Sequence, residues 1–558
     1  MSNTIKQISS LEKIRLYENF DCKEIKEKTV MRGERFSYQV VVNSGDFRGF
    51  ATVGVESELK EYIKLYREEN VYVDIPFYGE IHDEGYLLEG EGNLPDVLVP
   101  LSEYNDAIPL IGKNIIIWVR VDIPKNASAG EYEIKLNFTS RSLGTAAVQS
   151  EAVESVSMKL KVIDADLPEQ ETRYTRWLHV DCIANVHGVE VYSETHWELI
   201  DKYIALASDV GINMILVPIH TPPLDTEIGT HRRCVQLVDI EKKGELYEFG
   251  FEKLERFVNI CKKHNIKYYE MAHLFSQWGA KHSPNIVVTE NGVTDYMFGW
   301  GIAANSPEYI NFLGQYVKAI CEQLDKYGIA DNVYFHVSDE PALAHIENYT
   351  IAHGILASNM KSGKTIDALS HYEFYERGLV DCPVCCVSHI DAFLDKPIKE
   401  RWTYYYCDNC KTYTNSFIAA PSARTRILGY QMYKYGISGF LQWGFNFYNS
   451  NKSIHTVNPY LSTSSGGWFP SGDAFIVYPA QNGAYSSIRA EVTYEAMQDI
   501  RVCNALEALI GKEAVIKMID EAAGRELRFD DYPRDSGFID SLREMMLSAI
   551  NEHITNKE

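Results

Sequence analysis

The sequence predicts an α/β protein in which an N-terminal antiparallel β-sandwich precedes a (β/α)8 TIM-type barrel and a helical tail closes the chain. Three observations predict this order. Apolar residues alternate with period two over residues 1–168, short apolar runs alternate with helical segments after Pro168, and helical periodicity resumes from about Ser487. A chain of 558 residues is also longer than one hydrophobic core usually serves, so several domains are expected.

The predicted sandwich rests on two runs in which every second residue is apolar, 132–138 and 156–162. Turn signals such as NSGD, PKNASAGE and DADLPE separate these runs from their neighbours. Such alternation is typical of strands with one face on a core. We therefore predict a supporting domain over residues 1–168, and leave open whether it also contributes a loop to a functional site.

Eight strand candidates follow Pro168, which is the number that closes the barrel. They lie at 172–180, 213–221, 266–274, 332–340, 364–372, 383–390, 401–407 and 438–446. Helical candidates lie near 194–210, 251–264, 306–328, 341–361 and 421–436, and several follow Ser, Asp or Pro start signals. The connections after the fifth and sixth strands are expected to be short or irregular. The barrel is thus predicted over 169–486, with a C-terminal helical segment over 487–558 packing on it.

Composition and charge exclude several classes of partner. With 45% hydrophobic and 24% charged residues the chain reads as a globular protein, and its formal net charge of −24 disfavours both nucleic acid and anionic lipid. No segment offers the roughly 18 apolar residues that a membrane span needs, and the first residues lack the apolar core of a signal peptide. We expect a cytoplasmic protein that binds neither nucleic acid nor membrane, and leave its oligomeric state open.

Two CxxC pairs, Cys382 with Cys385 and Cys407 with Cys410, have nearly the spacing of a zinc ribbon. However, the first pair opens one predicted strand and the second closes the next. In neighbouring parallel strands the pairs would lie about 20 Å apart, at 3.3 Å per residue. That separation excludes a shared tetrahedral ion, so we expect no zinc. The odd total of 11 cysteines also fits reduced thiols better than a disulfide framework.

Polar and aromatic residues follow the predicted strands at their carboxyl ends, where barrels of this type build their active sites. Each of them alone could be a structural polar group or a core aromatic residue. Their convergence on one face nevertheless predicts a functional site. The residues placed there are His179, Asp181, His220, Glu270, His273, Asp339, Glu340, His371, Tyr372, Tyr405, Tyr406, Trp443 and Asn446.

The fourth strand carries the most informative pair, Asp339 and Glu340. Alternate apolar residues over 333–337 supply the side expected to meet helices, so Glu340 belongs to the side that faces the barrel mouth. Asp339 reaches the same site only if the strand ends or is distorted there. Pro341 favours such a distortion, because it disfavours helical geometry at the preceding residue. The structural alternative is that this pair marks the start of a helix.

Neighbouring carboxylates in a confined mouth cannot both ionise easily, so one pKa is expected to rise until that group can act as a general acid near neutral pH. Glycosidic cleavage requires such an acid. Aromatic residues at the same barrel end would stack on the apolar face of a pyranose, while polar residues would bind its hydroxyls. The aromatic candidates are Trp278, Trp300, Trp443 and Tyr406, and the polar candidates are Asp473, Asn446 and the histidines.

Four longer segments carry a resemblance: HVSDEP at 336–341, IHTPPLDT at 219–226, HLFSQWGA at 273–280 and RTRILGYQMYKYGISGFLQWGFNFYN at 424–449. Together they resemble glycoside hydrolase family 123, the β-N-acetylgalactosaminidases, over most of 172–510. The resemblance implies a retaining, substrate-assisted mechanism in which the 2-acetamido carbonyl of the sugar is the nucleophile. Asp339 would orient the acetamido group, and Glu340 would protonate the leaving oxygen and then activate water. No metal or organic cofactor is implied, and the expected partner is a small carbohydrate substrate.

Two alternatives stay open at this point. An ordinary retaining glycosidase would use Glu340 as the acid and another carboxylate, such as Glu270, as a nucleophile about 5 Å away. A non-catalytic sugar-binding protein would keep the aromatic platform, but it has no need of an intact Asp339–Glu340 pair.

Overall fold

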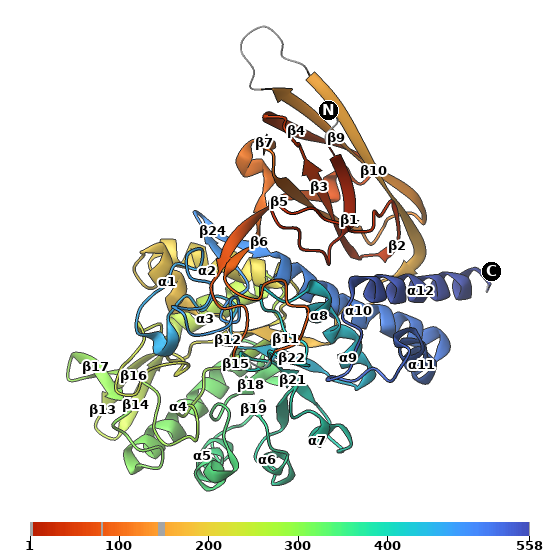
Figure 1. Cartoon of the computed structure of the whole chain (residues 1–558). Helices are drawn as coiled ribbons and strands as arrows, with labels where there is room; N and C mark the ends of the chain where they lie inside the picture. Colours follow the sequence, from red (N-terminus) through yellow and green to blue (C-terminus); the bar gives the residue numbers. More distant parts are fainter. Residues whose placement is uncertain (1–3, 80–81, 143–150, 557–558) are drawn as a thin grey trace.

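The computed structural model describes residues 4–79, 82–142 and 151–556 (Figure 1). It contains N-terminal β-sheets, a closed parallel barrel and C-terminal helices in the predicted order, so the predicted fold class is confirmed. Within the described ranges, every helix is too short or too polar to cross a lipid bilayer.

Two sheets form the N-terminal sandwich. One has the strand order β1-β3-β8-β5-β6-β24-β23 and the other β2-β10-β9-β4-β7. Inward side chains of both sheets share one core, to which Ile134, Leu136 and Met158 of the two alternating runs contribute. The strands are β1 Thr4–Ser9, β2 Glu27–Arg32, β3 Arg35–Asn43, β4 Gly49–Glu56, β5 Ile63–Val73, β6 Gly92–Pro100, β7 Ala107–Leu110, β8 Asn114–Asp122, β9 Gly130–Ser142 and β10 Glu151–Asp166, with 3-10 turns at Lys60–Tyr62 and Leu101–Tyr104.

The hairpin of β23 (Tyr478–Ala480) and β24 (Gly483–Ser487) lies in the range that we predicted as barrel. It instead joins the N-terminal sheet, where β24 pairs antiparallel with β6 through Ser486 and Ser487. The strands of this hairpin are short and follow a Gly/Ser/Pro-rich stretch, so they carry no pattern of their own. One sheet therefore connects the sandwich to the end of the barrel.

The barrel closes through the order β11-β12-β15-β18-β19-β20-β21-β22, and β22 pairs back to β11. Each strand coincides with a predicted one but is shorter, because the chain leaves the ladder before the polar residues at each strand end. The strands are β11 Arg173–Arg176, β12 Met214–Val217, β15 Tyr268–Met271, β18 Val333–Phe335, β19 Lys364–Leu369, β20 Cys382–Cys386, β21 Trp402–Tyr404 and β22 Gly439–Gln442.

Helices surround the barrel, and the predicted start signals act as caps. The hydroxyls of Ser193 and Ser306 accept backbone N–H bonds at the first turns of α2 and α4. As predicted, the connections after β19 and β20 are short, with four-residue helices α6 and α7. The helices are α1 Val180–His187, α2 Glu194–Asp209, α3 Glu252–Lys263, α4 Pro307–Lys326, α5 Ile346–Ala357, α6 Glu373–Glu376, α7 Asp391–Leu394, α8 Ser422–Arg426 and α9 Leu428–Lys434, with 3-10 turns at Ala330–Asn332, Leu343–His345 and Asn451–Ser453.

Two hairpins that the sequence did not reveal form a small sheet beside the barrel, in the order β14-β13-β16-β17. They are β13 Asp239–Lys243 with β14 Leu246–Gly250, and β16 Ile286–Glu290 with β17 Val293–Phe298. These strands are only five or six residues long, and the sheet projects to one side of the barrel, away from the sandwich (Figure 1).

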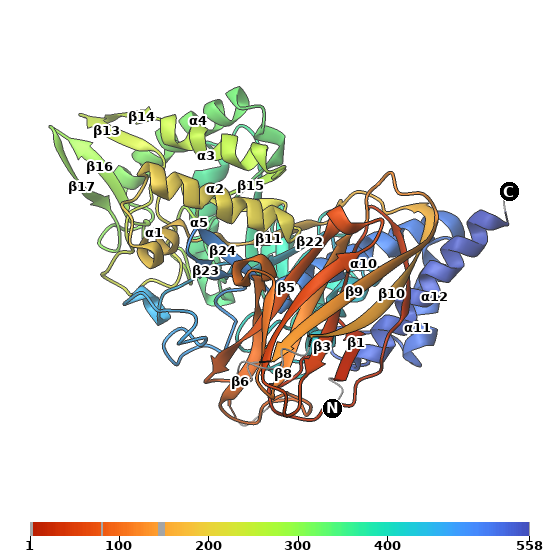
Figure 2. The same ribbon diagram turned by 90° about the horizontal axis from the view of Figure 1, so that it is seen from above.

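The C-terminal segment contains α10 (Ile488–Ile510), α11 (Lys512–Ala523) and α12 (Ser536–Thr555). Helix α10 packs on α8 and α9 of the barrel, and α12 contacts β2 and β10 of the sandwich (Figure 2). A chain of buried ion pairs crosses this junction, in which Arg543 contacts Glu34 and Asp499 while Asp499 also pairs with Arg426. The C-terminal helices thus hold the sandwich and the barrel together.

Candidate active site

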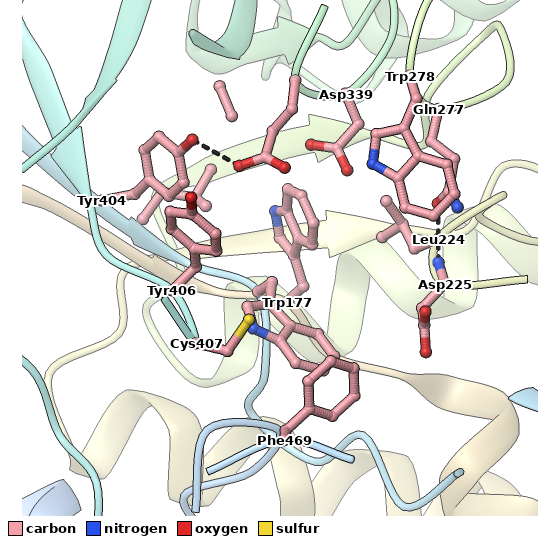
Figure 3. A pocket seen from close by; sticks show the side chains of 14 residues that line it. Trp177, Leu224, Asp225, Gln277, Trp278, Asp339, Tyr404, Tyr406, Cys407 and Phe469 are labelled. Carbon is pink, nitrogen blue, oxygen red and sulfur yellow. Dashed lines mark hydrogen bonds between the residues drawn. The ribbon is translucent and has the colours of Figure 1, made fainter. Parts of the chain in front are cut away.

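Asp339 and Glu340 lie in the loop after β18, and both line a pocket of about 220 Å³ (Figure 3). Strand β18 ends at Phe335, and Glu340 has a φ of 42°, in the left-handed region that non-glycine residues rarely adopt. This distortion, which the sequence predicted, lets two neighbouring side chains point into one cavity. Helix α5 begins only at Ile346, so the pair does not cap it.

The two carboxylates have different partners. Glu340 Oε1 accepts a hydrogen bond from the Tyr404 hydroxyl at 2.5 Å. Within the described ranges, no protein group donates to the Asp339 carboxylate; only its backbone oxygen is bound, by the Trp278 N–H at 3.0 Å. Asp339 therefore offers free acceptor oxygens to whatever fills the pocket.

Both carboxyl groups are poised to hold a proton. Burial raises the pKa of Asp339 well above its ordinary value, and the neighbouring charge of Glu340 raises it further. Burial also raises the pKa of Glu340, opposed by the hydrogen bond from Tyr404. Two such neighbours titrate as a pair, so a donor that binds one carboxylate shifts the shared proton to the other.

A buried ion-pair network lies beneath this loop. His336 Nε2 contacts Glu270 Oε2 at 2.9 Å, and Nδ1 contacts Asp367 Oδ1 at 3.1 Å. Burial opposes protonation of His336, but the two carboxylates outweigh it and raise its pKa to about 9. Asp367 Oδ2 accepts the backbone N–H groups of Val337 and Ser338, at 3.2 and 3.1 Å. The network therefore holds the backbone that leads to Asp339.

Glu270 is fully buried and does not line the pocket. Its oxygens accept hydrogen bonds from Thr175 Oγ1 and, at 2.9 Å, from Trp177 Nε1, in addition to the contact with His336. A carboxylate bound in this way inside the barrel core cannot reach a sugar in the pocket. The alternative that used Glu270 as nucleophile loses its support.

The geometry of the described residues also bears on metal binding. One group of potential ligands, His273 with His336 and Asp367, has ligand atoms within 4.8 Å of one another. The two imidazoles are stacked, with centroids 4.1 Å apart and planes 20° apart. An imidazole lone pair lies in the plane of its ring, so nearly parallel stacked rings cannot both point at one ion. The group contains no cysteine, and the absence of zinc stays a prediction.

Five of the predicted site residues line the pocket: Asp339, Glu340, Trp278, Tyr406 and Trp443. Trp278 lies at the mouth with 49% of its surface exposed and a φ of 55°. Trp443 Nε1 donates to Asp473 Oδ2 at 2.9 Å. Asp473 thus supports the wall from behind, where burial raises its pKa to about 7.

The other predicted sugar-binding residues lie outside the pocket lining. His273 is buried against His336, and Asn446 binds the backbone of His179 through both amide atoms. Side chains alternate along residues 404–406, so Tyr404 and Tyr406 line the pocket while Tyr405 points away from it. The Tyr405 hydroxyl accepts a hydrogen bond from Arg176. Trp300 donates to the Thr230 carbonyl, Tyr372 packs edge-on against Phe393, and His371 lies beside it ahead of α6.

Sequence reasoning missed most of the pocket wall. Tyr404 could have been found by parity with Tyr406, but three consecutive tyrosines hide the alternation. Asp225, in the segment IHTPPLDT, accepts from the Lys452 N–H at 2.8 Å, and burial raises its pKa to about 6. Its carboxyl group lies on a different side of the pocket from Asp339 (Figure 3). The full set not predicted is Trp177, Leu224, Asp225, Gln277, Ala368, Tyr404, Cys407, Leu441 and Phe469.

An acidic pair at the open end of a parallel barrel, facing aromatic walls, is the arrangement of a glycoside hydrolase. Comparison with known families shows which glycoside hydrolase family the chain belongs to. The model described as the catalytic domain of glycoside hydrolase 123 matches residues 177–506, and the chain therefore belongs to glycoside hydrolase family 123. This confirms the resemblance found in the four segments, and it speaks against a non-catalytic sugar-binding protein.

Solved structures support the fold. A family 123 glycoside hydrolase from Clostridium perfringens, from a structural study of glycolipid glycan hydrolysis, matches with a TM-score of 0.74 and 15% identity, over 100% of this chain and 98% of that one. A family 5 glycoside hydrolase from Bacteroides vulgatus (TM-score 0.33, 12% identity, 56% and 66% coverage) shares too little of the fold to bear on function. The same holds for a family 2 β-galacturonidase from Eisenbergiella tayi (0.30, 11%, 83% and 69%). A search of curated proteins finds no match.

Proposed function

We propose that this glycoside hydrolase removes β-linked N-acetylgalactosamine from glycans or glycoconjugates by a retaining, substrate-assisted mechanism. The observation that carries the proposal is the contrast within the acidic pair. Glu340 is held by Tyr404, while the Asp339 carboxylate beside it has no protein donor in the described ranges. A substrate group with an N–H to donate would complete the site.

Glu340 is the proposed general acid and base. Burial raises the pKa of its carboxyl group, so the group keeps a proton that it can transfer to the glycosidic oxygen as the bond to the anomeric carbon breaks. The resulting carboxylate then removes a proton from the water that attacks the anomeric carbon. The proton balance closes over the two steps, and Glu340 returns to its acid form.

The acetamido group of the substrate is the proposed nucleophile. Its carbonyl oxygen attacks the anomeric carbon within the same molecule, and such intramolecular reactions reach very high effective molarities. Asp339 accepts the acetamido N–H and balances the positive charge of the cyclised intermediate. This hydrogen bond also stabilises the Asp339 carboxylate, so that the proton shared by the pair stays on Glu340.

The pocket walls suit a single sugar ring. Trp177, Trp443 and Tyr406 offer aromatic surfaces to the apolar face of a pyranose, and Gln277 and Asp225 offer polar groups to its hydroxyls. The galacto configuration is the first choice because the family consists of β-N-acetylgalactosaminidases, and the gluco epimer is the second. We include glycoconjugates among the proposed substrates because the study of the Clostridium perfringens relative concerns glycolipid glycan hydrolysis.

A panel of aryl β-glycosides that differ only at C2 and C4 tests the proposal. We expect cleavage of the 2-acetamido-2-deoxy-β-galactoside, slower cleavage of the gluco epimer, and no cleavage of the β-galactoside with a hydroxyl at C2. A thiazoline that mimics the cyclised intermediate should inhibit as a transition-state-like ligand. Equal rates on the acetamido sugar and its C2-hydroxyl counterpart would contradict the mechanism.

A second candidate is an ordinary retaining mechanism with a protein nucleophile. The observation that favours it is Asp225, a third carboxylate in the pocket wall. An activated 2-fluoro glycoside would then leave a covalent sugar ester on Asp225, detectable by mass spectrometry of the digested protein. The substrate-assisted proposal expects no such adduct.

A further inference from the structure

We propose that the N-terminal sandwich shapes the sugar-binding pocket through Tyr78, a positioning residue between β5 and β6. This inference deepens the proposed function and rests on its assignment of the pocket as the sugar site. Among the residues that the structure describes, none that lines this pocket precedes Trp177, so the sandwich acts from behind the wall. The side concerned carries Cys407 and Phe469, away from Asp339 (Figure 3).

Tyr78 joins the two loops that supply this wall. Its backbone N–H donates to Cys410 Sγ at 3.2 Å, and the Cys410 thiol in turn donates to the Cys407 carbonyl at 3.1 Å. The Tyr78 hydroxyl donates to the backbone carbonyl of Trp468, the residue before Phe469. One residue of the sandwich therefore contacts the loop after β21 through its backbone N–H and the loop ahead of β23 through its side chain.

The neighbours of Tyr78 bind the same two loops. Asp83 accepts from the Thr412 N–H at 2.6 Å and pairs with Arg424 at 2.9 Å, while the Tyr86 hydroxyl donates to the Cys410 carbonyl at 2.7 Å.

On the other loop, Asp74 accepts hydrogen bonds from Ser464 and, at 3.0 Å, from Ser471. The backbone of Ile75 also accepts from the Ser471 N–H at 2.7 Å. We call residues 74–79 with 82–87 the sandwich clamp.

The loops need such support because they contain little regular structure. No helix or strand lies between β21 and α8, or between the 3-10 turn at Asn451–Ser453 and β23. Loops of this length in a compact domain depend on contacts with rigid neighbours. The clamp supplies them from the connection between the paired strands β5 and β6, and β6 also pairs with β24 beyond the second loop.

The clamp should govern sugar binding and leave proton transfer alone. Tyr78 has no contact with Asp339 or Glu340 among the interactions of the described residues, and its partners Cys410 and Trp468 lie behind the pocket lining. Loosening the clamp would let the wall move away from the sugar. The expected effect is a higher KM at nearly constant kcat, with an unchanged pH profile.

The test compares Tyr78→Phe with Tyr72→Phe. Both changes remove one hydroxyl from the same domain, but the Tyr72 hydroxyl donates to Glu91 at the surface of the sandwich. For Tyr78→Phe we expect a KM about fivefold higher, which corresponds to the loss of one hydrogen bond, and a kcat within about twofold of wild type. Hydrogen–deuterium exchange should rise in a peptide spanning 463–473, because the lost hydroxyl binds Trp468, whereas the loop at 405–413 keeps its bond to the backbone N–H of residue 78. Tyr72→Phe should change neither KM nor hydrogen–deuterium exchange.

Each remaining outcome has a defined meaning. Unchanged exchange in the 463–473 peptide of Tyr78→Phe would overturn the inference, as would a fall in kcat with constant KM or an equal effect of Tyr72→Phe. Thermal unfolding of both variants separates a local change in the wall from a general loss of stability. If the wild type cleaves another aryl glycoside and not the 2-acetamido-2-deoxy-β-galactoside, the proposed substrate is wrong. The role of Tyr78 is then still decided by the exchange measurement and by the same comparison of variants on the glycoside that is cleaved.

Discussion

The backbone N–H of Trp278 donates to the backbone carbonyl oxygen of Asp339 at 3.0 Å. This bond joins the rim of the pocket to the loop with the acidic pair. Trp278 and Glu340 both adopt left-handed backbone conformations, with φ of 55° and 42°. Such conformations persist only where surrounding contacts enforce them. The bond therefore links two segments whose strained geometry aims side chains into one cavity.

Glu340→Ala should remove most activity on glycosides with poor leaving groups. The leaving oxygen would depart unprotonated, which corresponds to a loss on the order of 10²–10⁴ for general-acid catalysis. Aryl substrates with very acidic leaving groups need little protonation and should lose much less in the first step. The measurement is kcat/KM over a series of leaving groups. An equal loss across the series would show that Glu340 is not the acid.

Asp339→Asn should lower the rate by a factor that does not depend on the leaving group. The change removes the negative charge that balances the cyclised intermediate, while Glu340 remains able to protonate the leaving oxygen. The same leaving-group series, measured beside Glu340→Ala, separates the two roles. If Asp339→Asn proves sensitive to leaving-group acidity, the two carboxylates have been assigned the wrong way round.

Tyr404→Phe should extend activity to higher pH. The acid form of Glu340 is required, so the rate falls as pH rises through the pKa of this group. The hydrogen bond from Tyr404 stabilises the carboxylate and lowers that pKa; its removal should raise the pKa and move the basic limb upward. Profiles of kcat/KM against pH report the shift. Tyr406→Phe is the matched control, since Tyr406 lines the same pocket without a hydrogen bond to Glu340.

His336 should make the free energy of unfolding fall as pH rises into the alkaline range. Its pKa rises from 6.5 to about 9 in the folded protein, so its stabilising contribution is complete below pH 6.5 and is lost as pH rises through about 9. The contribution is on the order of 3 kcal/mol. Urea unfolding of wild type at pH 6.5 and 9 should show the loss, and His336→Gln should be less stable at pH 6.5 with a flatter dependence. A wild type equally stable at both pH values would contradict a charged His336.

Metal analysis of chelator-washed protein should find no stoichiometric zinc. In the barrel, Cys385 pairs in register with Thr403, which leaves Cys382 toward the start of β20 and Cys407 beyond the end of β21. One zinc ion retained per chain would require these cysteines to converge, and would contradict the register.

The barrel was predictable because parallel strands buried on both faces are continuous apolar runs. The pair at 339–340 was also predictable, since parity assigned Glu340 to the mouth and Pro341 indicated the break. The small sheet was not, because its strands are only five or six residues long and mix apolar with polar residues without a pattern that separates them from loops.

Individual wall residues were harder to predict. His273, Asn446 and Tyr405 occur at strand ends like true lining residues, but their side chains bind core groups or backbone. Position in the sequence cannot distinguish a polar side chain that binds other buried groups from one that binds a ligand. The contact of Tyr78 with Trp468 joins residues from opposite ends of the chain, and no local pattern carries that information.

The pairing of β24 with β6 has a practical consequence for anyone who would rearrange this protein. The hairpin that follows the barrel is an integral part of the N-terminal sheet, so the sandwich cannot be exchanged as a module along the linear sequence. Removing residues 1–168 would strip β24 of its partner and leave an unpaired strand edge, which favours aggregation. A chimera with a foreign barrel would have to carry residues 478–487 along with the sandwich, and a circular permutant should place its new ends outside both strands.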